Sequence, residues 1–427
     1  MNRRNFLKGS SIGAAGILIT NQMSQIKQTF AADLDNFNSK INGDFTHLRS
    51  AYQLSPDVQY FNHASIGTIP SAVQKARQKY LELCESNPWL YMWGGAWEES
   101  REETRKKSAQ LLNCSPDEVA LTHNTTEGFN ILANGLPLGK GDEVVFSSMN
   151  HAGASVCWFH QAKDKGFQVN KFDFPVTSSS ELSKQDVLDL YDRNITNRTR
   201  VLVFPHIDNI VGLNHPVREL TELARSKGVE FIAVDGAQAV GMVQTDMRDM
   251  DVDFYACSPH KWVQSPKGTG MLFMKKEQQL HVKPMWVTWG QNRWKGTVRI
   301  FEDYGTRNLA EVLALGDAID FQQKLGMKAK LKHYEKLWEY FVEVIDNHPQ
   351  LQWRSPRKWE LSSSIYAVEV INKKSSELSQ ELFKNHGIIV RPFSSQGLNT
   401  LRISPNVFDT KKDLDDLVEI LLAYTKA

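Results

Sequence analysis

Short apolar runs alternate with amphipathic stretches between residues 118 and 274. The apolar runs are typical of buried strands, and several stretches between them have helical end signals. The segment 216–225, for example, begins at Pro216 and is followed by Gly228. Strand and helix repeated in this way predict an α/β fold, with a mostly parallel sheet covered by helices on both faces. The expected strands are residues 118–122, 142–147, 199–205, 229–235, 252–256 and 270–274.

The pattern changes after about residue 300. Two long helices are expected at 310–325 and 328–347, then strands at 364–371, 387–391 and 401–404 and a last helix at 411–424. This order predicts a smaller α+β domain with its own sheet. We therefore expect a large domain at residues 55–300, a small C-terminal domain at 301–427, and a segment at 33–54 that packs on the small domain.

Composition is that of an ordinary globular protein. The chain has 427 residues, of which 41% are hydrophobic and 23% charged, and its net charge is +1. A nucleic-acid partner is not expected, because such proteins carry a marked excess of basic residues.

The first 32 residues differ from the rest. Arg3-Arg4 precedes Phe6-Leu7-Lys8 and a weakly apolar run from Ile12 to Ile19, and small residues follow at 29–32. This arrangement resembles a twin-arginine signal peptide; the alternative is an amphipathic N-terminal helix. The apolar run is too short to span a bilayer, so no stable membrane anchoring is expected. We expect the twin-arginine export machinery to carry the folded protein to the periplasm or beyond.

Four cysteines occur, at positions 84, 114, 157 and 257. Their spacing matches no metal-binding motif, and no metal site is expected. A chain of this length needs no disulfides, so buried free thiols are the favoured interpretation, although an oxidising compartment would permit disulfides.

A lysine follows one of the expected strands. The run Val252-Asp-Phe-Tyr-Ala-Cys-Ser258 is stopped by Pro259, and Lys261 comes two residues later. Asp235 similarly ends the strand 229–235. Open α/β sheets bind ligands at the carboxyl ends of their strands. A lysine and an acid at neighbouring strand ends suit pyridoxal 5'-phosphate (PLP), which needs an amine for its Schiff base and an acid at its pyridine nitrogen.

Other polar residues follow strands in the same way. Thr125 and Thr126 lie between a strand and a probable helix, where hydroxyls and free N–H groups form a phosphate site; an ordinary helix cap is the alternative. His151 follows the strand 142–147 and could stack on the cofactor ring, or could be structural. Gln238 could donate to the ring oxygen, and Ser258 and His260 could reach the phosphate.

With these motifs, the chain resembles the class V aminotransferase family of PLP fold type I, in particular the branch of isopenicillin N epimerase-like proteins related to cysteine desulfurases and selenocysteine lyases. The motifs Asp235-Gly-Ala-Gln238 and Ser258-x-His260-Lys261 carry the resemblance, which extends from about Tyr60 to the C-terminus.

The resemblance assigns a role to each matching residue. Lys261 is the Schiff-base lysine, Asp235 contacts the pyridine nitrogen, and His151 stacks on the ring. The other implied cofactor contacts are Thr125, Thr126, Asn209, Gln238, Ser258, His260 and, from the second subunit of a homodimer, Thr306. The implied substrate contacts are Asn62, His63 and Arg402, of which Arg402 holds the α-carboxylate.

Two departures from the desulfurases bear on the reaction. Their nucleophilic cysteine lies on a loop shortly before the matching arginine, and here that region, residues 391–397, contains serines and no cysteine. Tryptophans are also abundant at 89–97 and 286–294, where they could line a pocket for a bulky substrate or a dimer interface.

These features favour an enzyme that acts at Cα of an amino acid or amino-acid moiety, as an isopenicillin N epimerase-like protein would. One alternative is an exported transaminase or C–S/β-lyase that modifies an amino-acid moiety of a larger metabolite such as a siderophore. Another is a PLP-fold binding module without catalysis.

Overall fold

The computed structural model describes residues 22–35, 45, 47–89 and 96–426. The arginine pair and the apolar run of the expected leader lie outside the described residues, as do residues 90–95 of the first tryptophan-rich segment.

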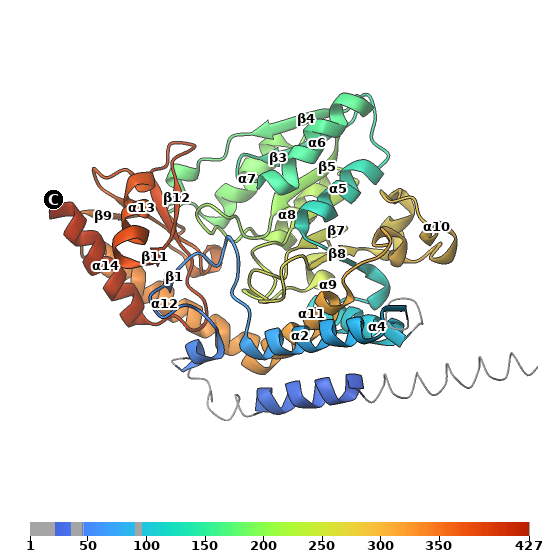
Figure 1. Cartoon of the computed structure of the whole chain (residues 1–427). Coiled ribbons are helices and arrows are strands. Elements are labelled where there is room, and N and C mark those ends of the chain that lie inside the picture. Colours follow the sequence, from blue (N-terminus) through green and yellow to red (C-terminus); the bar gives the residue numbers. More distant parts are fainter. Residues whose placement is uncertain (1–21, 36–44, 46, 90–95, 427) are drawn as a thin grey trace, which may run out of the picture.

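A seven-stranded sheet forms the centre of the large domain (Figure 1). Five neighbouring strands are parallel, and β8 runs antiparallel to both β7 and β2. The predicted mostly parallel sheet is therefore confirmed. In spatial order the strands are β2 (Val119–Thr122), β8 (Gly270–Met274), β7 (Phe254–Cys257), β6 (Phe231–Asp235), β5 (Thr199–Pro205), β3 (Glu143–Ser147) and β4 (Gln168–Phe172).

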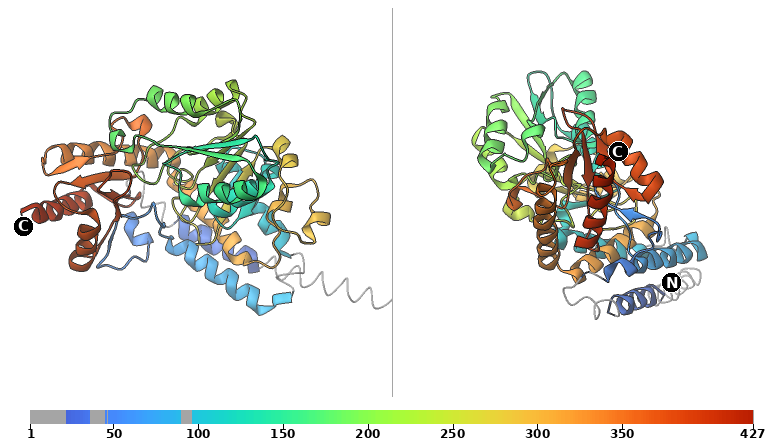
Figure 2. Two further views of the ribbon diagram at one scale, coloured as in Figure 1. Left: turned by 90° about the horizontal axis from the view of Figure 1, so that it is seen from above. Right: turned by 90° about the vertical axis from the view of Figure 1, so that its left-hand side faces the viewer.

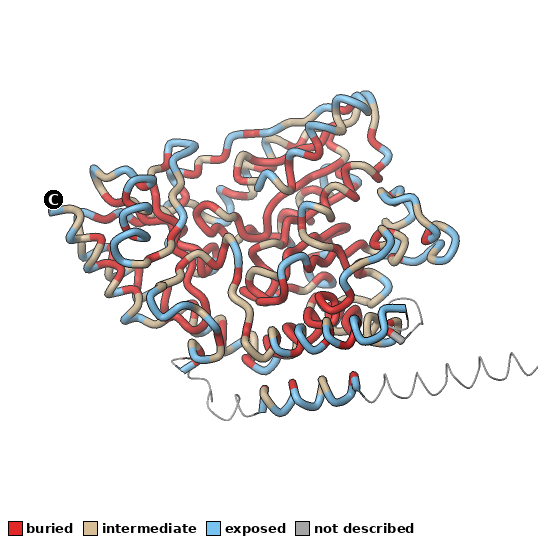
Figure 3. Tube along the Cα trace, in the orientation of Figure 1, coloured by how far each residue is buried: buried red, intermediate tan, exposed pale blue. Residues whose placement is uncertain are grey.

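Both faces of this sheet are buried, which explains the continuous apolar runs of its strands. Along β5, Val201 and Val203 face a cluster with α5 and α6, whereas Leu202 and Phe204 face a cluster with α7 and α8. The buried residues, in red, fill the interior of the molecule (Figure 3). The helices around the sheet are α2 (Ser71–Ser86), α4 (Ala96–Leu111), α5 (Thr125–Gly135), α6 (Ala152–Lys165), α7 (Lys184–Asn194), α8 (Val217–Ser226), α9 (Met247–Met250), α10 (Gly290–Arg293) and α11 (Leu309–Leu325).

The C-terminal part has its own antiparallel sheet. Its strands, in spatial order, are β12 (Arg391–Phe393), β13 (Thr400–Ile403), β10 (Tyr366–Val370) and β9 (Leu351–Trp353). The helices α12 (Met327–Asp346), α13 (Ser375–His386) and α14 (Lys411–Lys426) enclose a third apolar cluster with this sheet. Helix α11, just beyond the expected domain boundary at residue 300, packs on α2 and α4.

The chain before α2 joins the two parts. Strand β1 (Gln59–Tyr60) pairs in parallel with β11 (Ile388–Ile389) of the C-terminal part. Tyr52 packs against Phe408, and its hydroxyl donates to Gln264 Oε1 at 2.8 Å. The N-terminal segment therefore contacts both parts close to their junction.

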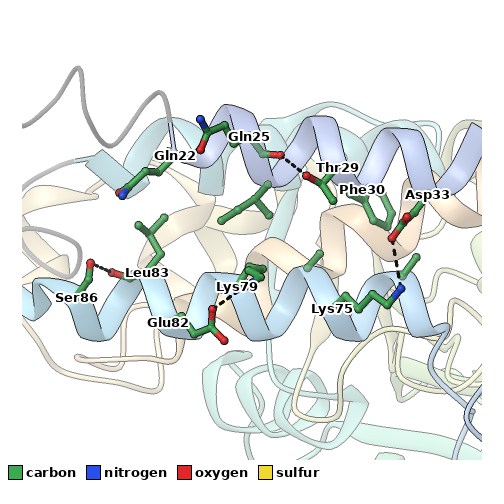
Figure 4. A pocket seen from close by; sticks show the side chains of 13 residues that line it. Gln22, Gln25, Thr29, Phe30, Asp33, Lys75, Lys79, Glu82, Leu83 and Ser86 are labelled. Atoms are coloured by element: carbon green, nitrogen blue, oxygen red, sulfur yellow. Dashed lines mark hydrogen bonds and ion pairs between the residues drawn. The ribbon is translucent and has the colours of Figure 1, made fainter.

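Residues 22–35 form a helix that lies alongside α2 (Figures 1 and 2). Its buried side chains are Met23, Phe30 and Leu34. A groove of about 510 Å³ runs between the two helices, and Asp33 there pairs with Lys75 at 3.8 Å (Figure 4). The helix passes through the small residues at 29–32 that the sequence marks as a cleavage region.

All four cysteines are free, and three of them are buried. No helix in the described ranges is long and apolar enough to cross a membrane.

Candidate active site

Lys261 lies in a turn four residues after β7. Its backbone N–H donates to Ser258 O at 3.1 Å, and its side chain is half-buried. Gly67 packs on this turn from the N-terminal segment and donates to His260 O at 3.0 Å. A Cβ at Gly67 would lie 1.8 Å from Lys261 O, so only glycine allows this approach. The lysine is thus held between two segments distant in sequence.

Asp235 ends β6, the strand next to β7, and is 3% exposed. Its Oδ1 accepts a hydrogen bond from Ala237 N at 2.9 Å. Burial raises the pKa of this carboxyl. Burial also lowers the pKa of Lys261 to about 8, with Asp235 opposing this shift and Arg402 adding to it. The site therefore contains an acid that can share a proton and an amine that can be neutral near physiological pH.

The N-termini of α5 and α6 converge beside this pair. Thr125, the first residue of α5, donates its N–H to Ser258 Oγ at 3.0 Å, and the two hydroxyls are 2.8 Å apart. A Cβ at Gly153 in α6 would lie 2.5 Å from Thr126 Oγ1, which shows how closely the two helix ends approach. Two helix N-termini with hydroxyl groups form a suitable site for a phosphate.

Two histidines flank the site. His151 caps α6 by accepting the N–H of Gly153 on Nδ1 at 3.0 Å, and its ring is exposed. The surrounding protein partly desolvates this ring and so lowers the pKa of His151, an effect that Asp235 opposes. His260 Nδ1 is buried and has no hydrogen-bond partner in the described part of the chain, as expected of a group that awaits a ligand. Burial lowers the pKa of His260 to about 4.

Gln238 is held by two hydrogen bonds. Its Nε2 donates to Ala64 O at 2.8 Å, and its Oε1 accepts from Trp262 Nε1 at 2.8 Å. The remaining hydrogen on Nε2 is available to a ligand. Sequence reasoning did not find Trp262, although it directly follows the lysine. Its role is the hydrogen bond to Gln238, which lies 24 residues earlier in the chain.

Arg402 on β13 is 2% exposed, and its hydrogen-bond partners among the described residues are neutral. Its guanidinium donates to Asn62 Oδ1 at 2.8 Å, Ser65 Oγ at 2.6 Å and Asn209 O at 2.7 Å, and Nε is buried without a partner among the described residues. Burial lowers the pKa of Arg402 to about 9. A buried cation without an acid favours an anionic ligand. Ser65 was missed in the sequence, where a serine after His63 carries no distinctive signal.

Two predicted residues lie apart from this group. His63 is fully buried between Tyr60, Trp262 and Phe408, and burial lowers its pKa to about 3. Its ring contacts the Asn406 amide at 3.3 Å rather than the Arg402 guanidinium.

Thr306 is exposed and lines a separate groove of about 520 Å³. Trp289 and Trp294 line the same groove, and Trp289 is 92% exposed. The tryptophan-rich segment 286–294 therefore contributes to the same groove as Thr306.

These residues fit PLP. Asp235 interacts electrostatically with the lysine and can hold the ring nitrogen, Gln238 has a free donor for the ring hydroxyl, and the ends of α5 and α6 can hold the phosphate. His260, whose buried Nδ1 has no partner among the described residues, directly precedes the lysine.

Fold and site together define a PLP-dependent enzyme of fold type I. Residues 59–417 match the family model described as Aminotransferase class-V, so the chain belongs to the class V aminotransferase family. It is 30% identical over 406 residues to the isopenicillin N epimerase of Amycolatopsis lactamdurans, covering 90% of this chain and 99% of that protein. It is 32% identical to a probable cysteine desulfurase of Halobacterium salinarum, covering 88% of this chain and 94% of that protein.

A solved structure has the same fold. It is a C-DES mutant with glycine covalently linked to its PLP cofactor, with a TM-score of 0.78 and 19% identity. The match covers 87% of this chain and 98% of that one.

Proposed function

We propose that this PLP enzyme removes and returns the proton at Cα of an amino acid or amino-acid moiety, in an epimerase-like reaction. The observation that carries the proposal is the set formed by Lys261, Asp235 and Arg402. It provides a base whose pKa is lowered to about 8, a buried acid, and a cation whose hydrogen-bond partners in the described part of the chain are all neutral.

Each residue has a defined task. PLP, when bound, supplies a ring that accepts the electrons released at Cα. Asp235 shares a proton with the ring nitrogen. Lys261 Nζ takes the proton from Cα, and Arg402 holds the α-carboxylate by parallel hydrogen bonds so that Cα faces the lysine.

Epimerisation is favoured over sulfur transfer by the loop 391–397. A desulfurase needs a cysteine thiolate there, and this loop has none. Instead, Gln396 Oε1 accepts from Ser148 Oγ at 2.8 Å and joins the loop to the strand end before His151. The relationship to isopenicillin N epimerase supports the same choice. The competing outcomes are transamination and loss of a β-substituent, as in a siderophore-modifying lyase.

The test is hydrogen exchange at Cα. The holoenzyme in deuterium oxide, offered single amino acids, is expected to introduce deuterium at Cα with no loss of amine, as followed by mass spectrometry. Lys261→Ala should abolish exchange, whereas Lys332→Ala, which changes an exposed lysine on α12, should retain it. Formation of the pyridoxamine form would indicate a transaminase, and pyruvate release a lyase. Full exchange by Lys261→Ala would refute the proposal.

We also propose that the enzyme is a homodimer. The support is the exposed apolar surface around Thr306, where Val287 and Trp289 are about nine-tenths exposed. Large exposed apolar patches mark interaction surfaces. Light scattering of the purified holoenzyme measures the mass.

Export by the twin-arginine pathway is a further part of the proposal. Its support is Arg3-Arg4 followed by an apolar run. That pathway carries folded proteins and would deliver the enzyme with its cofactor bound. Cell fractionation measures the location.

A further inference from the structure

A second arginine, Arg391, lies directly opposite Arg402 in the small sheet. Strands β12 and β13 are antiparallel neighbours, and Arg391 pairs in register with Arg402. Directly opposite residues project their side chains on the same face of a sheet, and like charges in this position destabilise it. Arg402 is buried and Arg391 is exposed. The chain therefore keeps two guanidinium groups on neighbouring strands, one buried and one exposed.

Phe393 lies beside both cations. The Arg391 guanidinium carbon is 5.8 Å from the centre of its ring, and that of Arg402 is 5.4 Å away. Such distances are within the range of cation–π contacts. The Phe393 ring therefore contacts both guanidinium groups.

The charge of Arg391 reaches the candidate active site. It contributes to lowering the pKa of Arg402, after burial, and it also lowers the pKa of His151. His151 caps α6 and interacts electrostatically with Asp235 and Lys261. Arg391 therefore acts electrostatically on two residues of the candidate site, Arg402 and His151.

Arg391 has no acidic partner within the described residues. The acids that act on Arg402 and His151 have other partners: Asp208 accepts hydrogen bonds from the N–H groups of Ile210 and Val211, and Asp235 accepts the N–H of Ala237 and interacts electrostatically with Lys261. The phosphate would bind at the ends of α5 and α6, and one α-carboxylate would satisfy Arg402. One cation remains unmatched after these groups are assigned.

We propose that Arg391 binds a second carboxylate of the substrate, so that the enzyme acts on amino acids or amino-acid moieties with an acidic side chain. The inference rests on the proposed function for the role of Arg402. A guanidinium suits this task, because its planar fork binds a carboxylate with two parallel hydrogen bonds and stays charged.

The first test compares L-glutamate with its neutral isostere L-glutamine, by titrating the holoenzyme and following the absorbance of its cofactor. Glutamate is expected to bind about tenfold more tightly or better, the usual effect of one charge-assisted pair. Arg391→Gln should remove this preference by weakening glutamate alone, and Arg391→Lys should retain part of it. The control Arg357→Gln, which changes an exposed arginine paired with Asp346, should behave as wild type. Equal binding of both ligands by wild type, or equal weakening of both by Arg391→Gln, would overturn the proposal.

The second test separates this inference from the proposed function. Glutarate and its half-amide lack an amine and undergo no Cα chemistry. The difference between their affinities for the holoenzyme therefore reports only carboxylate binding. A preference for glutarate that depends on Arg391 supports the second carboxylate site even if no amino acid exchanges its Cα hydrogen. Deuterium exchange without any preference for acidic ligands would support the proposed function and reject this inference.

Discussion

The acid–base properties of the side chains in the site depend on their surroundings and not only on the residue type. Lys261 is an amine in a half-buried turn, and the pKa of its amine is lowered to about 8 because burial disfavours the ammonium form. Asp235 opposes this effect, because its negative charge stabilises the ammonium form. The balance places the titration of the reactive group near the pH at which an enzyme works.

This balance predicts how cofactor capture depends on pH. Only the neutral amine attacks an aldehyde, so the rate at which the cofactor-free protein takes up PLP should rise about tenfold per pH unit and level off near pH 8. The rate is measured by stopped-flow absorbance between pH 6 and 10. Asp235→Asn removes the opposing charge and should move the midpoint to lower pH.

N-acetyl-lysine is the control for this experiment, because it reveals the titration of PLP itself. Its reaction rate should continue to rise to about pH 10, as expected of an unperturbed lysine. A protein midpoint equal to that of N-acetyl-lysine would contradict the effect of burial.

Among the secondary-structure elements, the helix at residues 22–35 was the least expected. The sequence suggests a leader that ends near residue 32, and the structure packs this helix on three others. Lys27 pairs with Glu103 of α4, Asp33 with Lys75 of α2, and Asp35 with Lys324 of α11. A protease that cuts within this helix must first separate it from the folded body.

Phe30→Ala tests this docking. Loss of a buried aromatic side chain weakens packing by about 3 kcal/mol or more, so the helix should detach more often and trypsin should cut after Lys27 at least about tenfold faster. Limited proteolysis of the full chain with mass spectrometry measures the rate. Gln28→Ala changes an exposed neighbour and should have no effect. Cutting of wild type at the rate of Phe30→Ala would show that the helix is not docked.

The strands could be predicted where burial makes them apolar. Strand β6 is buried at all five positions, and its first four residues form a continuous apolar run. Strand β4 was missed because it lies at the sheet edge, where the sequence Gln168-Val-Asn-Lys-Phe172 is mostly polar and partly exposed. Edge strands need not be apolar on both faces, so periodicity does not reveal them.

The residues of the candidate site also differ in how far they could be predicted from the sequence. Lys261 and Asp235 could be predicted because both lie next to strand ends in recognisable motifs. Ser65, Trp262 and Arg391 could not, because their importance depends on contacts across the chain: with Arg402, with Gln238 and with the opposite strand. Contacts between segments that are distant in sequence are properties of the fold, and a single local motif does not reveal them.

The junction between the two parts of the molecule contains a buried lysine. Lys330, near the start of α12, is 1% exposed and donates to Gly241 O in the large domain and to Gln322 Oε1 in α11. Both partners are neutral, so burial lowers the pKa of Lys330 from 10.5 to about 7. Folding of the whole molecule is thereby linked to the release of a proton.

The sign of this linkage follows from proton occupancy. Between pH 7 and 10.5 the unfolded chain holds a proton on Lys330 that the folded chain has lost. The free energy of unfolding should therefore increase with pH across this range, by up to about 1.4 kcal/mol per pH unit from this group. Urea unfolding of the protein at pH 7, 8 and 9 measures the increase.

Lys330→Met should remove this part of the slope, while Lys261 and Arg402, which titrate in the same range, contribute equally to both proteins. The variant leaves two acceptors unpaired and should be less stable at pH 9 by about 1–3 kcal/mol. At pH 7 the difference should shrink, because wild type then carries the cost of a buried charge. Lys328→Met, an exposed neighbour on α12, should keep the wild-type slope. An unchanged slope in Lys330→Met would mean that this lysine stays charged in the folded protein, with water or a partner that compensates its burial.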